Sequence, residues 1–175
     1  MCSKRTIYNL HDFDDFNLKS YSVNSKMRKL YLNSKEVFIR CEDCVIKYEP
    51  TIWGSCLPYL SLCVSLLPDD YEKLKYIDSQ LMHKLCSASR WHYLVRAPDT
   101  LRVRLGEGAR ATTFWTSDGS RASAPESFRN LPCNVVIKLS YLYNINDMQG
   151  IMADIESIQF TVKAPAHSAN TIACS

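Results

Sequence analysis

The sequence has no apolar run long enough to cross a membrane. A spanning helix needs about 18 or more consecutive apolar residues. The longest candidate, Leu57 to Leu67, has eleven residues and is interrupted by Pro58 and two serines. Lys4 and Arg5 near the start are not followed by an apolar block, which argues against a secretory signal. The sequence therefore predicts a soluble intracellular protein with no membrane partner.

Glycine and proline are scarce, and the charges nearly balance. Five glycines and seven prolines in 175 residues exclude collagen-like and low-complexity chains. Hydrophobic residues make up 46 % and charged residues 22 %, which is enough to bury the core of one ordinary domain. The net charge of +3 is too weak, taken alone, to indicate a polyanionic partner.

The motifs of the common enzyme classes are missing. There is no GxxxxGK[ST] phosphate loop, no GxSxG nucleophile turn and no HExxH metal motif. Gly106 and Gly108 lack the third glycine and the following helix of a dinucleotide site, so they predict a hairpin. The cluster of Asp12, Asp14 and Asp15 favours a solvated face over a metal site. We therefore expect no enzymatic activity and no cofactor.

Eight cysteines are present, and free thiols explain them best. A chain of this length can build a core without disulfides, and the sequence has no secretory signal. Cys41 and Cys44 have the spacing of a zinc knuckle, but Cys56 and Cys63 follow at gaps that do not match a second close pair. We predict no structural metal and no disulfide, with zinc on Cys41 and Cys44 as the alternative.

Three segments differ in composition. Residues 1–26 mix acidic and aromatic residues and predict an N-terminal arm. This arm would either pack loosely on the domain or dock on a neighbouring subunit through Phe13 and Phe16, and the second possibility predicts a homo-oligomer. Residues 27–163 predict the folded domain. Residues 164–175 are small and polar without periodicity, and predict a flexible tail.

Short strands with alternating apolar residues dominate the domain. We expect them near residues 30–32, 37–41, 45–48, 57–66, 101–105, 111–115, 135–143 and 151–163, with a turn at Glu42-Asp43. In the last segment the apolar parity switches between Ile155 and Ile158, which predicts a β-bulge near Glu156-Ser157. Such a bulge lets a sheet bend into a small barrel.

One amphipathic helix follows Asp69, which we expect to be its N-cap. Leu74, Ile77, Leu81 and Leu85 then form an apolar stripe at helical spacing. A second, short helical turn is expected at residues 125–129.

Basic residues and aromatic rings concentrate between residues 84 and 138. This stretch holds nine lysines and arginines against four acidic residues, with aromatic rings between them. Cations that follow phosphates and rings that stack on bases are what single-stranded nucleic acid needs. The alternative is that the cations form a solvated sheet face and that the tryptophans belong to the core. Alternation along the strand 135–143 assigns Tyr141 and Tyr143 to the core face. The candidate phosphate contacts are Arg96, Arg102, Arg104, Arg110 and Lys138, and the candidate stacking residues are Trp91, Tyr93, Phe114 and Trp115.

The stretch from Leu101 to Phe160 resembles a known family. It runs from a strand through Ser117-Asp-Gly119 to the strand Leu131–Lys138, and ends in Gly150-Ile-Met-Ala-Asp-Ile-Glu-Ser-Ile-Gln-Phe160. This order is similar to the C-terminal half of the OB-fold single-stranded-DNA-binding proteins of phages and large DNA viruses. The acidic tail of many members is absent, because Ala164–Ser175 contains no acidic residue.

The resemblance implies a mainly β fold: an OB-like five-stranded barrel, closed or partly open, with one or two short helices. It implies a non-catalytic, viral protein that coats single-stranded DNA, or RNA, in replication or recombination. The place of action would then be the host nucleus or a viral replication compartment. The alternative is a β-rich virion or assembly protein that self-associates through residues 1–26.

Overall fold

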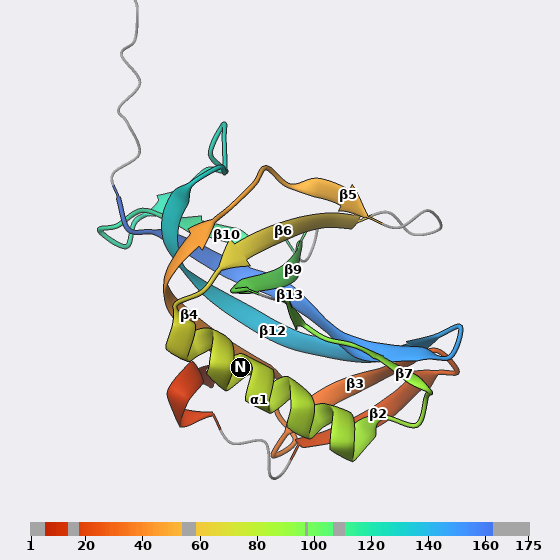
Figure 1. Cartoon of the computed structure of the whole chain (residues 1–175). Coiled ribbons are helices and arrows are strands. Elements are labelled where there is room, and N and C mark those ends of the chain that lie inside the picture. Colours follow the sequence, from red (N-terminus) through yellow and green to blue (C-terminus); the bar gives the residue numbers. More distant parts are fainter. Residues whose placement is uncertain (1–5, 14–17, 54–58, 97, 107–110, 163–175) are drawn as a thin grey trace, which may run out of the picture.

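The computed structural model describes residues 6–13, 18–53, 59–96, 98–106 and 111–162. Within them lie strands, one 3₁₀ turn (η1) and one α-helix (Figure 1). In chain order the elements are β1 (Ile7–Asn9), η1 (Leu10–Asp12), β2 (Leu18–Asn24), β3 (Met27–Leu32), β4 (Val37–Ile46), β5 (Thr51–Trp53), β6 (Tyr59–Ser65), α1 (Pro68–Leu85), β7 (Arg90–His92), β8 (Val95–Arg96), β9 (Thr100–Leu105), β10 (Thr113–Trp115), β11 (Arg121–Ala122), β12 (Leu131–Ile145) and β13 (Met148–Phe160).

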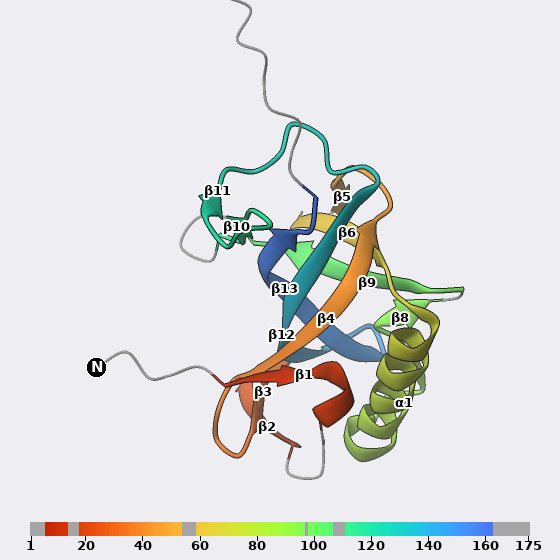
Figure 2. The same cartoon turned by 90° about the vertical axis from the view of Figure 1, so that its left-hand side faces the viewer.

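Five strands form a hydrogen-bonded ring in the order β4, β6, β9, β13 and β12, which returns to β4. The ring is closed between β9 and β13 by only two parallel pairs, Arg104 with Asp154 and Leu105 with Ile155. Figure 2 shows the strands crossing one another as in a small barrel. The mainly β, five-stranded and partly open barrel expected from the sequence is confirmed.

A bulge in β13 bends the hairpin that it makes with β12. Val136 pairs with Ser157 and Ile137 pairs with Ile155, so Glu156 is an extra residue. Because of it, Ile155 and Ile158 both point into the core, where they are 1 % and 0 % exposed. The bulge expected near Glu156-Ser157 is confirmed.

A second bulge, at Ser140 in β12, was not expected. Leu139 pairs with Ala153 and Tyr141 with Met152, which leaves Ser140 unmatched. Beyond it Leu142 is buried in the core, and Tyr143 lies on the opposite face of the strand. Tyr141 and Tyr143 flank Leu142 and therefore share that opposite face, so their assignment to the core is wrong.

The turn expected at Glu42-Asp43 is a bulge within one continuous strand. Cys41 pairs with Val135 and Cys44 with Cys133, so two residues of β4 face Asn134 of β12. Asp43 adopts a φ of 49°, and its backbone N–H donates to the Asn134 side-chain oxygen at 3.0 Å.

The helix α1 begins two residues earlier than expected, because Leu67 and not Asp69 is the N-cap residue, and Pro68 occupies the first turn. Leu74, Ile77 and Leu81 are buried as the apolar stripe predicted. The helix packs against η1 and β8 (Figure 2). No helix in the described residues is long and apolar enough to span a membrane.

The described part of the N-terminal segment, residues 6–13 and 18–24, does not form an arm outside the domain. β1 pairs in parallel with β4, and β2 pairs in antiparallel with β3. Phe13 is 3 % exposed in the core, with its ring edge-on to Tyr8 at 5.8 Å between centroids. The expected boundary at residue 27 is thus corrected, and Phe13 is not available to dock on a neighbour. Phe16 and the expected tail, residues 164–175, lie outside the described residues.

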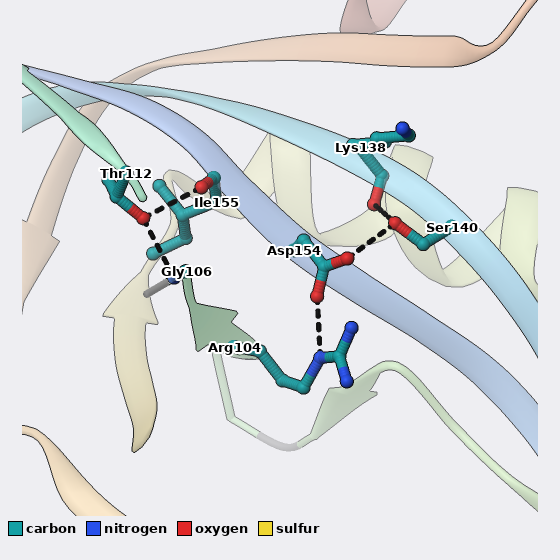
Figure 3. A network of polar contacts seen from close by, with 7 residues as sticks. All are labelled: Arg104, Gly106, Thr112, Lys138, Ser140, Asp154 and Ile155. Carbon is teal, nitrogen blue, oxygen red and sulfur yellow. Dashed lines mark hydrogen bonds and ion pairs between the residues drawn. The ribbon is translucent and has the colours of Figure 1, made fainter. Parts of the chain in front are cut away.

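The hairpin expected at Gly106–Gly108 is also corrected. β9 and β10 each pair in parallel with β13, so the two strands run in the same direction and do not pair with each other. Thr112 Oγ1 donates to the carbonyl of Ile155 at 2.8 Å and accepts from the N–H of Gly106 at 2.9 Å (Figure 3). Thr112 thus satisfies a carbonyl of β13 next to the bulge at Glu156 and the N–H of Gly106, which directly follows β9.

The segment 125–129 contains no helical turn. The carboxylate of Glu49 holds it instead, by accepting from the hydroxyl of Ser127 and from the backbone N–H groups of Phe128 and Arg129, at 3.0 and 3.2 Å for the last two. These bonds hold the pKa of Glu49 below its usual value.

Three thiols, those of Cys41, Cys44 and Cys133, are buried side by side between β4 and β12. Burial raises the pKa of Cys41 and of Cys133 to about 12, and raises that of Cys44 further, with the neighbouring thiols adding to the effect. No group of three metal-ligating side chains is found in the described parts of the chain.

We predict that these three cysteines resist maleimide labelling at pH 8 in the native protein, because the thiolate is the reactive form. Residue-resolved mass spectrometry should find them unlabelled in buffer with chelator and reductant, and labelled after unfolding in guanidinium. Rapid native labelling of Cys44, or zinc lost together with the fold on chelation, would contradict the prediction.

Candidate nucleic-acid interface

A cleft of about 240 Å³ lies between β9 and β13. It follows from how the two strands separate. β13 pairs with β9 only at Asp154 and Ile155, and earlier, at Met148–Gly150, it pairs with β7. β9 begins against β8 instead. The strands therefore diverge below Arg104, and the segment from His92 to Val95 bridges the opening.

Four of the candidate side chains line this cleft: Tyr93, Arg96, Arg102 and Arg104. Leu101 and Val103 are 0 % and 2 % exposed, so Arg102 and Arg104 lie on the opposite face of β9, as the alternation predicted. Arg96 is exposed at the end of β8. Three guanidinium groups thus converge on one opening from two neighbouring strands.

Arg104 also helps to close the barrel. Its Nε donates to Asp154 Oδ1 at 2.5 Å across the two-residue junction, and Ser140 Oγ donates to Asp154 Oδ2 at 2.6 Å (Figure 3). Arg104 and Asp154 side chains are only 25 % and 20 % exposed. The pair joins β9 to β13 and neutralises much of the charge of Arg104.

His92 connects Arg96 to Tyr143 across the cleft. Arg96 donates to His92 Nε2, because a guanidinium has no acceptor. His92 Nδ1 therefore carries the proton and donates to the hydroxyl of Tyr143 at 2.6 Å. Burial lowers the pKa of His92, and the charges of Arg96 and Arg102 lower it further. The imidazole is therefore neutral at physiological pH. The two guanidinium groups that help to keep it neutral both line the cleft.

Gly150 leaves room for this arrangement. It pairs with Tyr143 on one side and with His92 on the other. A β-carbon at Gly150 would lie 2.7 Å from the Tyr143 hydroxyl oxygen and 2.7 Å from the His92 carbonyl oxygen. Position 150, the glycine of the expected Gly-Ile strand motif, must therefore lack a side chain so that His92 and Tyr143 can pack beside it.

Trp91 and Tyr93 have different environments. The indole of Trp91 is partly buried against the core, and its Nε1–H donates to the buried carboxylate of Asp78 at 2.9 Å. Trp91 therefore fastens β7 to α1. Tyr93 is 42 % exposed beside the cleft, with its hydroxyl on Met82 Sδ at 3.3 Å. Of the two rings, Tyr93 is the one that a base can reach.

The remaining candidates lie elsewhere. Lys138 Nζ bonds to Glu36 at 2.6 Å and lies 5.6 Å from the centre of the Phe38 ring, on β12 beside β4. Phe114 is partly buried against the core and stacks on Phe160 at 6.2 Å between ring centroids. Trp115 is half-buried and pairs with Gln159, beyond the bulge of β13. Trp115 therefore does not lie beside Arg102 and Arg104 as expected, and Arg110 lies outside the described residues.

His92 and Tyr143 were missed by sequence reasoning. A single histidine 51 residues from its tyrosine partner carries no local signal. For Tyr143 the structure supplies what the sequence pattern did not: Leu139 and Leu142 are both buried although they lie three residues apart, which requires a bulge between them.

No protein-family model and no curated protein sequence matches the chain. Solved structures do match. The C-terminally truncated single-stranded DNA-binding protein from bacteriophage Enc34 matches with a TM-score of 0.51 and 11 % identity, over 84 % of this chain and 95 % of that one. The untruncated Enc34 protein gives 0.49 at 11 % identity over 87 % and 95 %, and its complex with ssDNA gives 0.47 at 13 % over 85 % and 97 %. Over most of its length, the chain thus shares the fold of the truncated phage protein.

Proposed function

We propose that this protein binds single-stranded DNA and coats it during viral replication or recombination, without catalysing a reaction. The observation that carries the proposal is the convergence of Arg96, Arg102 and Arg104 with Tyr93 on one opening of the barrel. Guanidinium groups neutralise phosphates and stack on bases, and an exposed tyrosine offers a ring for stacking. The fold shared with the truncated phage protein supports the same reading.

The alternative of an assembly protein that associates through residues 1–26 has lost its main support, because Phe13 is a core residue. The same surface chemistry also suits RNA, so the choice of nucleic acid is a matter for measurement.

We predict that fluorescence anisotropy with labelled dT oligonucleotides shows saturable binding that weakens as salt rises. Duplex DNA of the same length should bind at least about tenfold more weakly, because its bases cannot reach Tyr93 or the cleft. A matched rU oligonucleotide measures the preference for DNA over RNA. The absence of binding to dT and rU at low salt would refute the proposed function.

A further inference from the structure

The cleft between β9 and β13 reaches the hydrophobic core of the barrel. Its floor includes Leu94, Val103, Ile151 and Ala153, which are 8 %, 2 %, 5 % and 3 % exposed. Val103 and Ala153 belong to strands of the ring and point inward, as the neighbouring arginines and Asp154 point outward. An occupant of the cleft would therefore contact apolar side chains below and charged side chains above.

The size and charge of the cleft select the occupant. At about 240 Å³ it is smaller than the roughly 300–1,000 Å³ of pockets for drug-sized ligands. A single flat nucleobase suits this space, whereas a sugar and phosphate would be desolvated without compensation on the apolar floor. The guanidinium groups of Arg96 and Arg102 are donors only, and they complement flanking phosphates and the carbonyl oxygens of a base such as thymine.

We propose, on the basis of the proposed function, that one base of the bound strand unstacks and inserts between β9 and β13. Arg96 and Arg102 then contact the phosphates on either side of the inserted nucleotide. The wall formed by His92 and Tyr143 holds Arg96 at the rim through the hydrogen bonds described above. This site differs from stacking on an exposed ring, because the base enters the wall of the barrel.

The first test is an abasic scan with the unmodified protein. It uses the shortest dT oligonucleotide that binds with full affinity, with one abasic nucleotide placed at each position in turn. Insertion predicts that one position weakens binding by about tenfold or more, as the loss of one buried base should. A profile without such a position overturns the inference, even when the intact oligonucleotide binds tightly. The absence of any binding overturns the proposed function as well.

The second test separates insertion from stacking on Tyr93. The substitution Ala153→Leu places a larger side chain at the floor of the cleft, at one of the residues that line it. It should weaken binding of the intact oligonucleotide about tenfold and leave binding of the oligonucleotide abasic at the sensitive position almost unchanged. Ala111→Leu adds the same volume at an exposed site and should change neither. Equal losses for both oligonucleotides with Ala153→Leu would overturn the inference.

A third measurement does not depend on the folding of the variant. 2-Aminopurine at the sensitive position of the oligonucleotide, bound to the unmodified protein, should be protected from acrylamide quenching at least about threefold more than at the adjacent positions. Equal quenching at all positions would show that the base stays outside the barrel.

Discussion

The substitution Phe13→Ala should destabilise the protein by about 3–5 kcal/mol, the usual cost of removing a buried phenylalanine ring. Phe13 is 3 % exposed and packs with Leu10 and Leu18 in the core beside α1. His11 Nε2 lies 2.7 Å from Asp70 Oδ1 in the first turn of that helix, which holds η1 in place. Loss of the ring would leave a cavity where the N-terminal segment meets the domain. Urea unfolding followed by circular dichroism measures the effect.

Val23→Ala is the matched control in the same segment. Val23 is 54 % exposed on β2, so its truncation should change the free energy of unfolding by less than about 0.5 kcal/mol. If Phe13→Ala were as stable as Val23→Ala and only the oligomeric state changed, residues 6–13 would be a docking arm after all.

The N-terminal segment was misassigned because its burial depends on distant partners. Leu18 is the one buried residue of β2, an edge strand, and the rest of that strand alternates weakly. Phe13 stands among acidic residues, which are typical of a solvated segment. The turn η1 just before Phe13 lies against β4 and α1, and nothing in the local sequence reports those contacts.

The odd-or-even spacing of apolar residues along a strand was the most reliable signal for which side chains face the core. It failed where aromatic residues concealed a change of the core-facing positions from odd to even. Between Ile155 and Ile158 the polar pair Glu156-Ser157 made the bulge visible. Around Ser140 the alternation of Leu139, Tyr141 and Tyr143 continued without a break, although Leu142 is the core residue. A tyrosine is compatible with either face of a strand, so the sequence did not distinguish the two registers.

The glycines after β9 illustrate a local preference that tertiary pairing overrides. Gly106 and Gly108 favour a hairpin, but a hairpin would pair β9 with β10 in antiparallel. The structure pairs both strands with β13 instead, and Thr112 completes the connection. The placement of Arg102 and Arg104 was still predictable, since it depends only on alternation within β9, whereas their distance from Trp115 depended on the hairpin.

The double substitution Arg96→Ala/Arg102→Ala should weaken binding of single-stranded DNA by at least about tenfold at low salt. It should lower the slope of log K against log salt by up to ~1.4, about 0.7 for each phosphate contact on a single strand. These two side chains line the cleft, and their charges act on His92 between them. Arg104 is left in place because its removal would leave Asp154 without its partner across the β9–β13 junction.

The control is Arg121→Ala/Arg129→Ala, which removes the same charge from exposed positions on β11 and the following loop. This control should change the slope by much less, because the slope counts contacts with phosphates and these two arginines are expected to make none. Tyr93→Ala should reduce affinity with almost no change in slope, since stacking releases no counterions. Equal slopes for the wild type and the Arg96/Arg102 variant, with equal affinity for dT, would show that these arginines are merely solvated. The interface would then lie on another face of the barrel.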